Sequence, residues 1–99
     1  KHYLLECLPG TRPAPDAEEA LDAFVGRLLR QGWTNPHRLR LSDDPVAFVS
    51  RDNAGEPRQL VYRIGLVRSE LLCEFQLYAP IVSNTDALPI VVEQLLTPP

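Results

Sequence analysis

A regular alternation of apolar residues along both halves of the segment 58–78 constrains the fold of this chain more than any other feature. The apolar positions are Leu60, Tyr62, Ile64 and Leu66 in the first half and Leu71, Cys73, Phe75 and Leu77 in the second half. A period of two residues is typical of a β-strand that buries one face. A two-residue turn at Arg68-Ser69 would set these positions opposite one another and would pair Arg63 with Glu74 on the other face. The segment therefore predicts a β-hairpin.

Two preceding segments, His37–Ser42 and Val46–Arg51, alternate in the same way on either side of a turn at Asp43-Asp44-Pro45. Opposing Phe48 with Leu60 keeps the apolar residues of all four strands on one side. We therefore expect an antiparallel meander of four strands with one consistent apolar face, on which a helix can lie.

The segment Asp16–Gln31 has the features of a single amphipathic helix. Asp16 is suited to cap its first turn, and Gly32 to end it in a left-handed conformation. Trp33 then falls where a Schellman motif places an apolar contact back onto the helix. The residues expected to form the buried stripe are Ala17, Ala20, Leu21, Phe24, Val25, Leu28 and Leu29.

The two ends of the chain add one element each. Tyr3–Leu8 is a short apolar segment before Pro9-Gly10 and predicts a first strand. Near the C-terminus, Thr85 or Asp86 is suited to cap a short helix, whose apolar residues are Leu88, Val91, Val92, Leu95 and Leu96. A strand is the alternative there, because three of the residues are β-branched.

The complete order is β-α-β-β-β-β-α, which predicts an α+β fold with one long helix on a mainly antiparallel sheet of about five strands. This order resembles in outline a helix-wrapped sheet of the cystatin-like or α+β-roll kind. The resemblance concerns topology alone, because no motif of a particular family is present.

Composition excludes several classes of function. The 99 residues correspond to a single domain, 1–99. The formal charge of −3 argues against nucleic-acid binding, which needs a basic surface. No apolar run approaches the ~20 residues of a membrane-spanning helix. The glycines match no phosphate-binding fingerprint, and no histidine or cysteine cluster is present, so the sequence predicts neither a cofactor nor a metal site.

Catalytic residues are not predicted. Cys7 and Cys73 both lie in apolar strand patterns, where free cysteines are expected to be buried and unreactive; a buried disulfide in an oxidising compartment is the alternative. His37 is the main candidate base. A second hypothesis places a small-ligand-binding or hydrolytic pocket between helix and sheet near Trp33, His37 and Tyr62. A third, to be tested by thiol titration, is an extracytoplasmic sensor or lipoprotein fragment.

The first hypothesis concerns the face of the sheet opposite the apolar one. The register places a mixture of arginine, tyrosine and aliphatic residues there, as is common at protein interfaces. The candidate interface residues are Arg38, Arg40, Val49, Val61, Arg63, Leu72, Glu74 and Tyr78. An ordinary solvated face, or one partly covered by the C-terminal helix, is the alternative. The first hypothesis is therefore a non-enzymatic interaction or accessory module that binds a protein partner or self-associates through this face.

Overall fold

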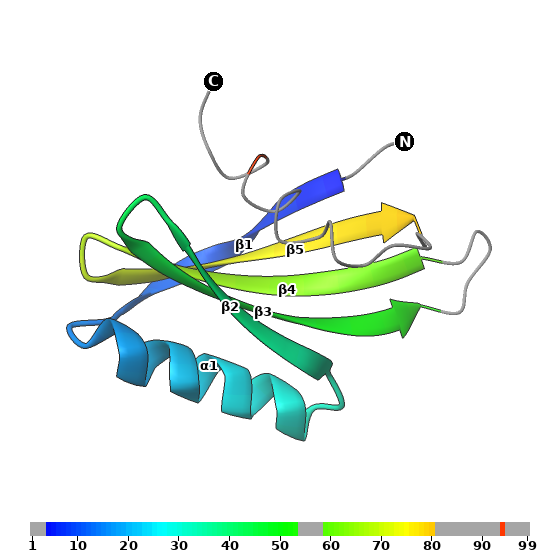
Figure 1. Cartoon of the computed structure of the whole chain (residues 1–99), viewed down its shortest axis with the longest axis horizontal. Helices are drawn as coiled ribbons and strands as arrows, with labels where there is room; N and C mark the ends of the chain where they lie inside the picture. Colours follow the sequence, from blue (N-terminus) through cyan, green and yellow to red (C-terminus); the bar gives the residue numbers. More distant parts are fainter. Residues whose placement is uncertain (1–3, 54–58, 81–93, 95–99) are drawn as a thin grey trace.

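The fold is one α-helix packed against a five-stranded antiparallel sheet, an α+β fold (Figure 1). The structure is a computed structural model and describes residues 4–53, 59–80 and 94. The elements are β1 (Leu4–Pro13), α1 (Ala17–Arg30), β2 (Thr34–Leu41), β3 (Asp44–Asn53), β4 (Gln59–Arg68) and β5 (Leu71–Pro80). The strand order is β1-β5-β4-β3-β2, so that β1 and β2 form the two edges. The predicted C-terminal helix lies outside the described residues.

Both ends of α1 form as the sequence predicts. The Asp16 carboxylate accepts a hydrogen bond from the backbone N–H of Glu19 at 3.2 Å. At the other end Gly32 has φ of +97°, and the backbone N–H of Trp33 donates to the carbonyl of Leu28 at 3.0 Å. This is the 6→1 bond of a Schellman motif, and it turns the chain sharply from the helix into β2.

The helix packs on the face of the sheet opposite the one that we expected. Leu21, Phe24 and Leu28 of α1 form one buried cluster with Val49, Val61 and other small apolar residues that alternate with the predicted inner positions. Leu29, expected in the stripe, is exposed. The prediction of the helix-bearing face was therefore wrong, although the division of residues between two faces was correct.

The predicted inner face carries a second apolar cluster of its own. Its buried members are Leu41, Val46, Phe48, Tyr62, Ile64, Leu66 and Leu77. Leu39, Leu60 and Phe75 are half-buried beside them. Both faces of the sheet are thus apolar at the centre, which is why alternation alone does not identify the face that the helix covers.

The strand register differs from the prediction by an even number of residues. The turn after β4 consists of Ser69 and Glu70, with φ of +54° and +60°, so that Arg68 pairs with Leu71. Arg63 therefore lies opposite Gln76 instead of Glu74. A shift of two residues leaves every side chain on its predicted face, because side chains alternate with a period of two.

β1 is longer than predicted. It continues past Gly10, which has φ of +87°, and its pairing with β5 shifts register between Cys7 and Thr11. A bulge of this kind lets an edge strand continue beyond residues that interrupt the ladder. Cys7 is exposed and Cys73 is half-buried, and both are free, so the expected burial was wrong for Cys7.

The different exposure of the two thiols predicts their reactivity. In the native protein, Ellman's reagent should modify Cys7 rapidly and Cys73 slowly, because Cys7 is exposed on the edge strand whereas Cys73 lies between β1 and β4. Two equivalents should react after unfolding without a reductant. A single rapid phase that includes both thiols, or none in the native protein, would contradict this arrangement.

Candidate functional site

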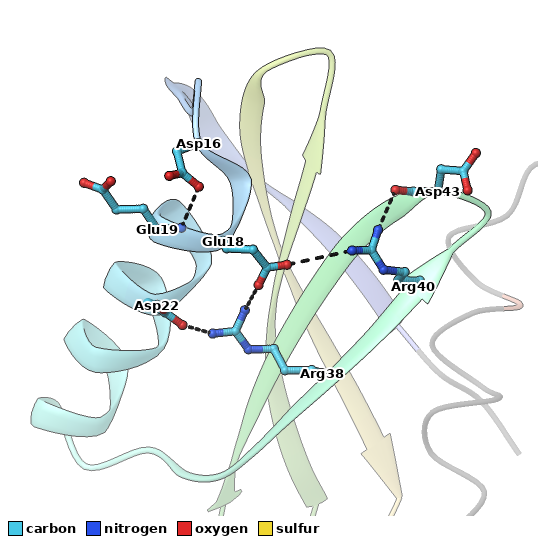
Figure 2. Close-up of polar contacts among 7 residues, drawn as sticks. All are labelled: Asp16, Glu18, Glu19, Asp22, Arg38, Arg40 and Asp43. Carbon is cyan, nitrogen blue, oxygen red and sulfur yellow. Dashed lines mark hydrogen bonds and ion pairs between the residues drawn. The ribbon is translucent and has the colours of Figure 1, made fainter.

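A set of ion pairs on one flank of α1 joins the helix to the edge strand β2 (Figure 2). The Arg38 guanidinium donates to the Asp22 carboxylate and lies 3.7 Å from that of Glu18. Arg40 lies 4.0 Å from Glu18 and donates to the carbonyl of Asp43 at 3.1 Å. All of these side chains are substantially exposed, so that each pair contributes ~1 kcal/mol or less. We interpret this set as a connection between the helix and the sheet.

A more buried ion pair joins the middle of α1 to β5. Arg27 donates to the Glu74 carboxylate at 2.8 Å, and the Glu74 side chain is largely buried. The Arg27 guanidinium also lies 5.7 Å from the centre of the Phe24 ring. Arg27 and Glu74 therefore satisfy each other beneath the helix, and neither is available to a partner without breaking this bond.

The guanidinium groups of Arg51 and Arg63 both lie against the ring of Trp33. The central carbon of Arg51 lies 4.7 Å from the indole ring centre, and that of Arg63 lies 5.4 Å from it. The Schellman motif fixes the tryptophan backbone, while β3 and β4 hold the two arginines on the helix-bearing face. The indole itself is 4% exposed. Two cations thus lie against one aromatic side chain, a favourable arrangement because the ring face is electron-rich.

Two polar side chains of β5 orient Arg63, the more buried of these two arginines. The Arg63 Nε–H donates to Gln76, and the Gln76 amide nitrogen donates to the Tyr78 hydroxyl. Arg63, Gln76 and Tyr78 are all half-buried, whereas Arg51 is exposed. We call Trp33, Arg51, Arg63, Gln76 and Tyr78 the tryptophan cluster.

The arginines of this protein differ in their partners. The ion pairs between described residues involve Arg27, Arg38, Arg40 and Arg68, and none involves Arg51 or Arg63. The latter two lie on the same aromatic ring and form no ion pair with another described residue. The tryptophan cluster is therefore a locally positive surface on a protein whose formal net charge is −3.

The predicted interface residues all lie on the helix-bearing face, and α1 determines what each of them contacts. Val49, Val61 and Leu72 are buried in the helix-side cluster, each 5% exposed or less. Arg38, Arg40 and Glu74 are ion-paired with the helix. Arg63 and Tyr78 belong to the tryptophan cluster. A charge placed at Val61 would therefore disturb the core and would not serve as a clean test of self-association.

Trp33, His37 and Tyr62, which were expected to lie around one pocket, are not brought together. Trp33 belongs to the helix-side cluster, whereas Tyr62 belongs to the cluster on the opposite face. His37 is exposed and stacks on Phe48 of that opposite face, with ring centres 5.1 Å apart. The sheet therefore separates Trp33 from His37 and Tyr62. The hypothesis of a small-ligand-binding or hydrolytic domain stays a prediction.

Arg51 is the residue that sequence reasoning overlooked. It lies two positions after Val49, so the same alternation places it on the predicted interface face. Trp33 was expected only to contact the helix. If the helix-bearing face had been known, Trp33, which follows the helix directly, would have been predicted on that face beside Arg51 and Arg63.

Among the described residues, no three histidine, cysteine or acidic side chains are placed to hold a metal ion. Within the same ranges, no helix has the length and apolar character needed to cross a bilayer.

Comparison with known proteins gave no relative. No protein-family model, no curated protein and no solved structure matches this chain.

Proposed function

We propose that this protein is a non-enzymatic interaction module that binds an acidic segment of a partner protein at the tryptophan cluster. The observation that supports the proposal is the position of Arg51 and Arg63 against Trp33, with no carboxylate of the described residues within ion-pair distance. Tryptophan, arginine and tyrosine are the residues that most often dominate the energy of protein interfaces.

The cluster is arranged to present charge at low entropic cost. Arg63 is held by Gln76, which is itself bonded to Tyr78, so that this guanidinium loses little freedom on binding. A guanidinium presents several N–H donors around its edge, which suits a carboxylate when the flat face rests on an aromatic ring. The sheet supplies a rigid base beneath it.

A partner's acidic segment can engage this surface without disturbing the ion pairs of the chain itself. The carboxylates Glu18 and Asp22 on α1 already pair with Arg38, and Glu74 pairs with Arg27. Using them across a dimer interface would require breaking these bonds. Self-association through the same face remains a distinct outcome that sedimentation can detect.

Trp33 is the only tryptophan in the chain, so its fluorescence reports directly on the proposed site. Titration with a short peptide of alternating glutamate and glycine should change this fluorescence, whereas the matching lysine peptide should not. The combined substitution of Arg51→Gln and Arg63→Gln should weaken binding of the acidic peptide by about tenfold or more, because two charge-assisted hydrogen bonds are lost. Raising the ionic strength should weaken binding to the unsubstituted protein.

Arg68→Gln provides the matched control, because Arg68 is an exposed arginine that pairs with Asp44 away from the cluster. This variant should bind the acidic peptide as the unsubstituted protein does. Equal loss of binding in Arg68→Gln and in the double variant would indicate a general charge effect and would overturn the proposal. Two other results would also overturn it. One is acidic-peptide binding that is unchanged in the double variant, and the other is concentration-dependent dimerisation that the double substitution abolishes.

A further inference from the structure

A second surface, which shares no residue with the tryptophan cluster, is hollowed. A groove of about 340 Å³ lies between α1 and the edge strand β1, towards the sheet edge opposite the ion pairs of Figure 2. This volume is within the range of about 300–1,000 Å³ that is usual for small-ligand sites. Its apolar walls come from Pro13, Ala20, Ala23, Phe24 and Leu72.

Three guanidinium groups surround these apolar walls. Arg12 comes from β1, and Arg27 and Arg30 come from successive turns of α1. The Arg30 guanidinium lies along the helix beside Gly26, where Nη1 is 3.4 Å from the position that a Cβ would take. The absence of a side chain at Gly26 thus lets Arg30 lie back along the helix beside the groove.

The charge of the groove is only partly balanced. Arg27 is neutralised by Glu74 at 2.8 Å. Between described residues, no ion pair involves Arg12 or Arg30. Two positive charges therefore line one concave surface without an ion-pair partner among the described residues, although the protein has an excess of acidic residues.

We propose that this groove binds a small phosphate monoester with an apolar organic part. A phosphate monoester carries about −1.5 to −2 charges at neutral pH, which matches the two guanidiniums that lack a carboxylate. Arginine forms paired N–H bonds with phosphate oxygens, and Arg12 and Arg30 both line the groove. A carboxylate carries a single charge and would leave one arginine unbalanced. The accessible apolar side chains of Pro13, Ala20 and Ala23 contact the organic part.

Isothermal titration calorimetry with phenyl phosphate tests this site in the full chain. Phenyl phosphate should bind at least about tenfold more tightly than benzoate, which keeps the ring but carries one charge. It should also bind more tightly than inorganic phosphate, which lacks the apolar part. Equal affinity for all three anions would show that neither the second charge nor the ring is recognised, and it would overturn the proposal.

Variants locate the site and separate it from the tryptophan cluster. Arg12→Gln combined with Arg30→Gln should weaken phenyl phosphate binding by about tenfold or more. Ala23→Leu should also weaken it without changing the charge, because the larger side chain fills the groove. Arg51→Gln with Arg63→Gln and, as a control, Arg68→Gln should leave it unchanged. Unaltered affinity in the Arg12/Arg30 variant, or loss in the Arg51/Arg63 variant, would contradict this placement.

Discussion

Phe24→Ala is expected to lower the free energy of unfolding by about 3–5 kcal/mol, the usual cost of truncating a buried phenylalanine. The Phe24 side chain is 1% exposed, and its ring lies directly over Gly65 of β4. Gly65 has no side chain that could fill the cavity left by the ring, so the helix would have to move to close it. Urea denaturation followed by circular dichroism measures the change.

The same contact makes a prediction for Gly65. A Cβ at that position would lie 3.0 Å from Cδ2 of the Phe24 ring, closer than a Cβ normally approaches another atom. Gly65→Ala should therefore destabilise the fold by about 1–3 kcal/mol. Gly26→Ala is the matched control, because its Cβ would meet only the flexible end of Arg30 and alanine favours the helix. Equal effects of the two substitutions would show that Phe24 does not pack against Gly65.

Trp33→Ala should cost about 3–5 kcal/mol for the same kind of reason. The indole is 4% exposed in the helix-side cluster, and its removal would also deprive Arg51 and Arg63 of the ring that they contact. Trp33→Phe should cost much less, since a phenyl ring keeps an apolar surface and an aromatic face for the arginines.

The measurement is again urea denaturation, read by circular dichroism because the variants lack the fluorophore. A loss below about 1 kcal/mol in Trp33→Ala would be the typical effect of a surface substitution. That result would contradict the two roles given to Trp33, which are to pack in the helix-side cluster and to contact Arg51 and Arg63.

The sequence contained enough information to assign residues to two faces of the sheet but not to choose between the faces. Each of the four meander strands alternates clearly, and an even shift in register does not move a side chain to the other face. The turn was misplaced because Ser69 and Glu70 adopt positive φ without the glycine or asparagine that usually marks such a turn. The register prediction for this hairpin therefore failed where turn chemistry was uninformative. The predicted pairing of Phe48 with Leu60 was also wrong, because Phe48 pairs with Ile64.

One residue carried a signal for the helix-bearing face. Gly65 interrupts an otherwise bulky strand, and a glycine within a strand often marks the close approach of another segment. It has the same parity as Val61 and Arg63, which identifies that face as the one beneath α1. The tryptophan cluster could have been predicted only after this step. The groove depends on how Arg12 of β1 lies relative to α1, which no local pattern contains.

The position of β1 at the edge beside β5 has a consequence for the order of folding. Every other neighbouring strand pair in the described sheet is joined by one short connection, so these pairs form with little loss of chain entropy. The partners Leu4 and Tyr78 stand near opposite ends of the chain, and their pairing must close a loop that contains the helix and three strands. Strand pairs that are far apart in the sequence tend to form late, because earlier local contacts lower the chain entropy that is lost when the long loop closes. We therefore expect the first strand of the sequence to be the last to join the sheet, so that the groove beside it is completed only in that final step.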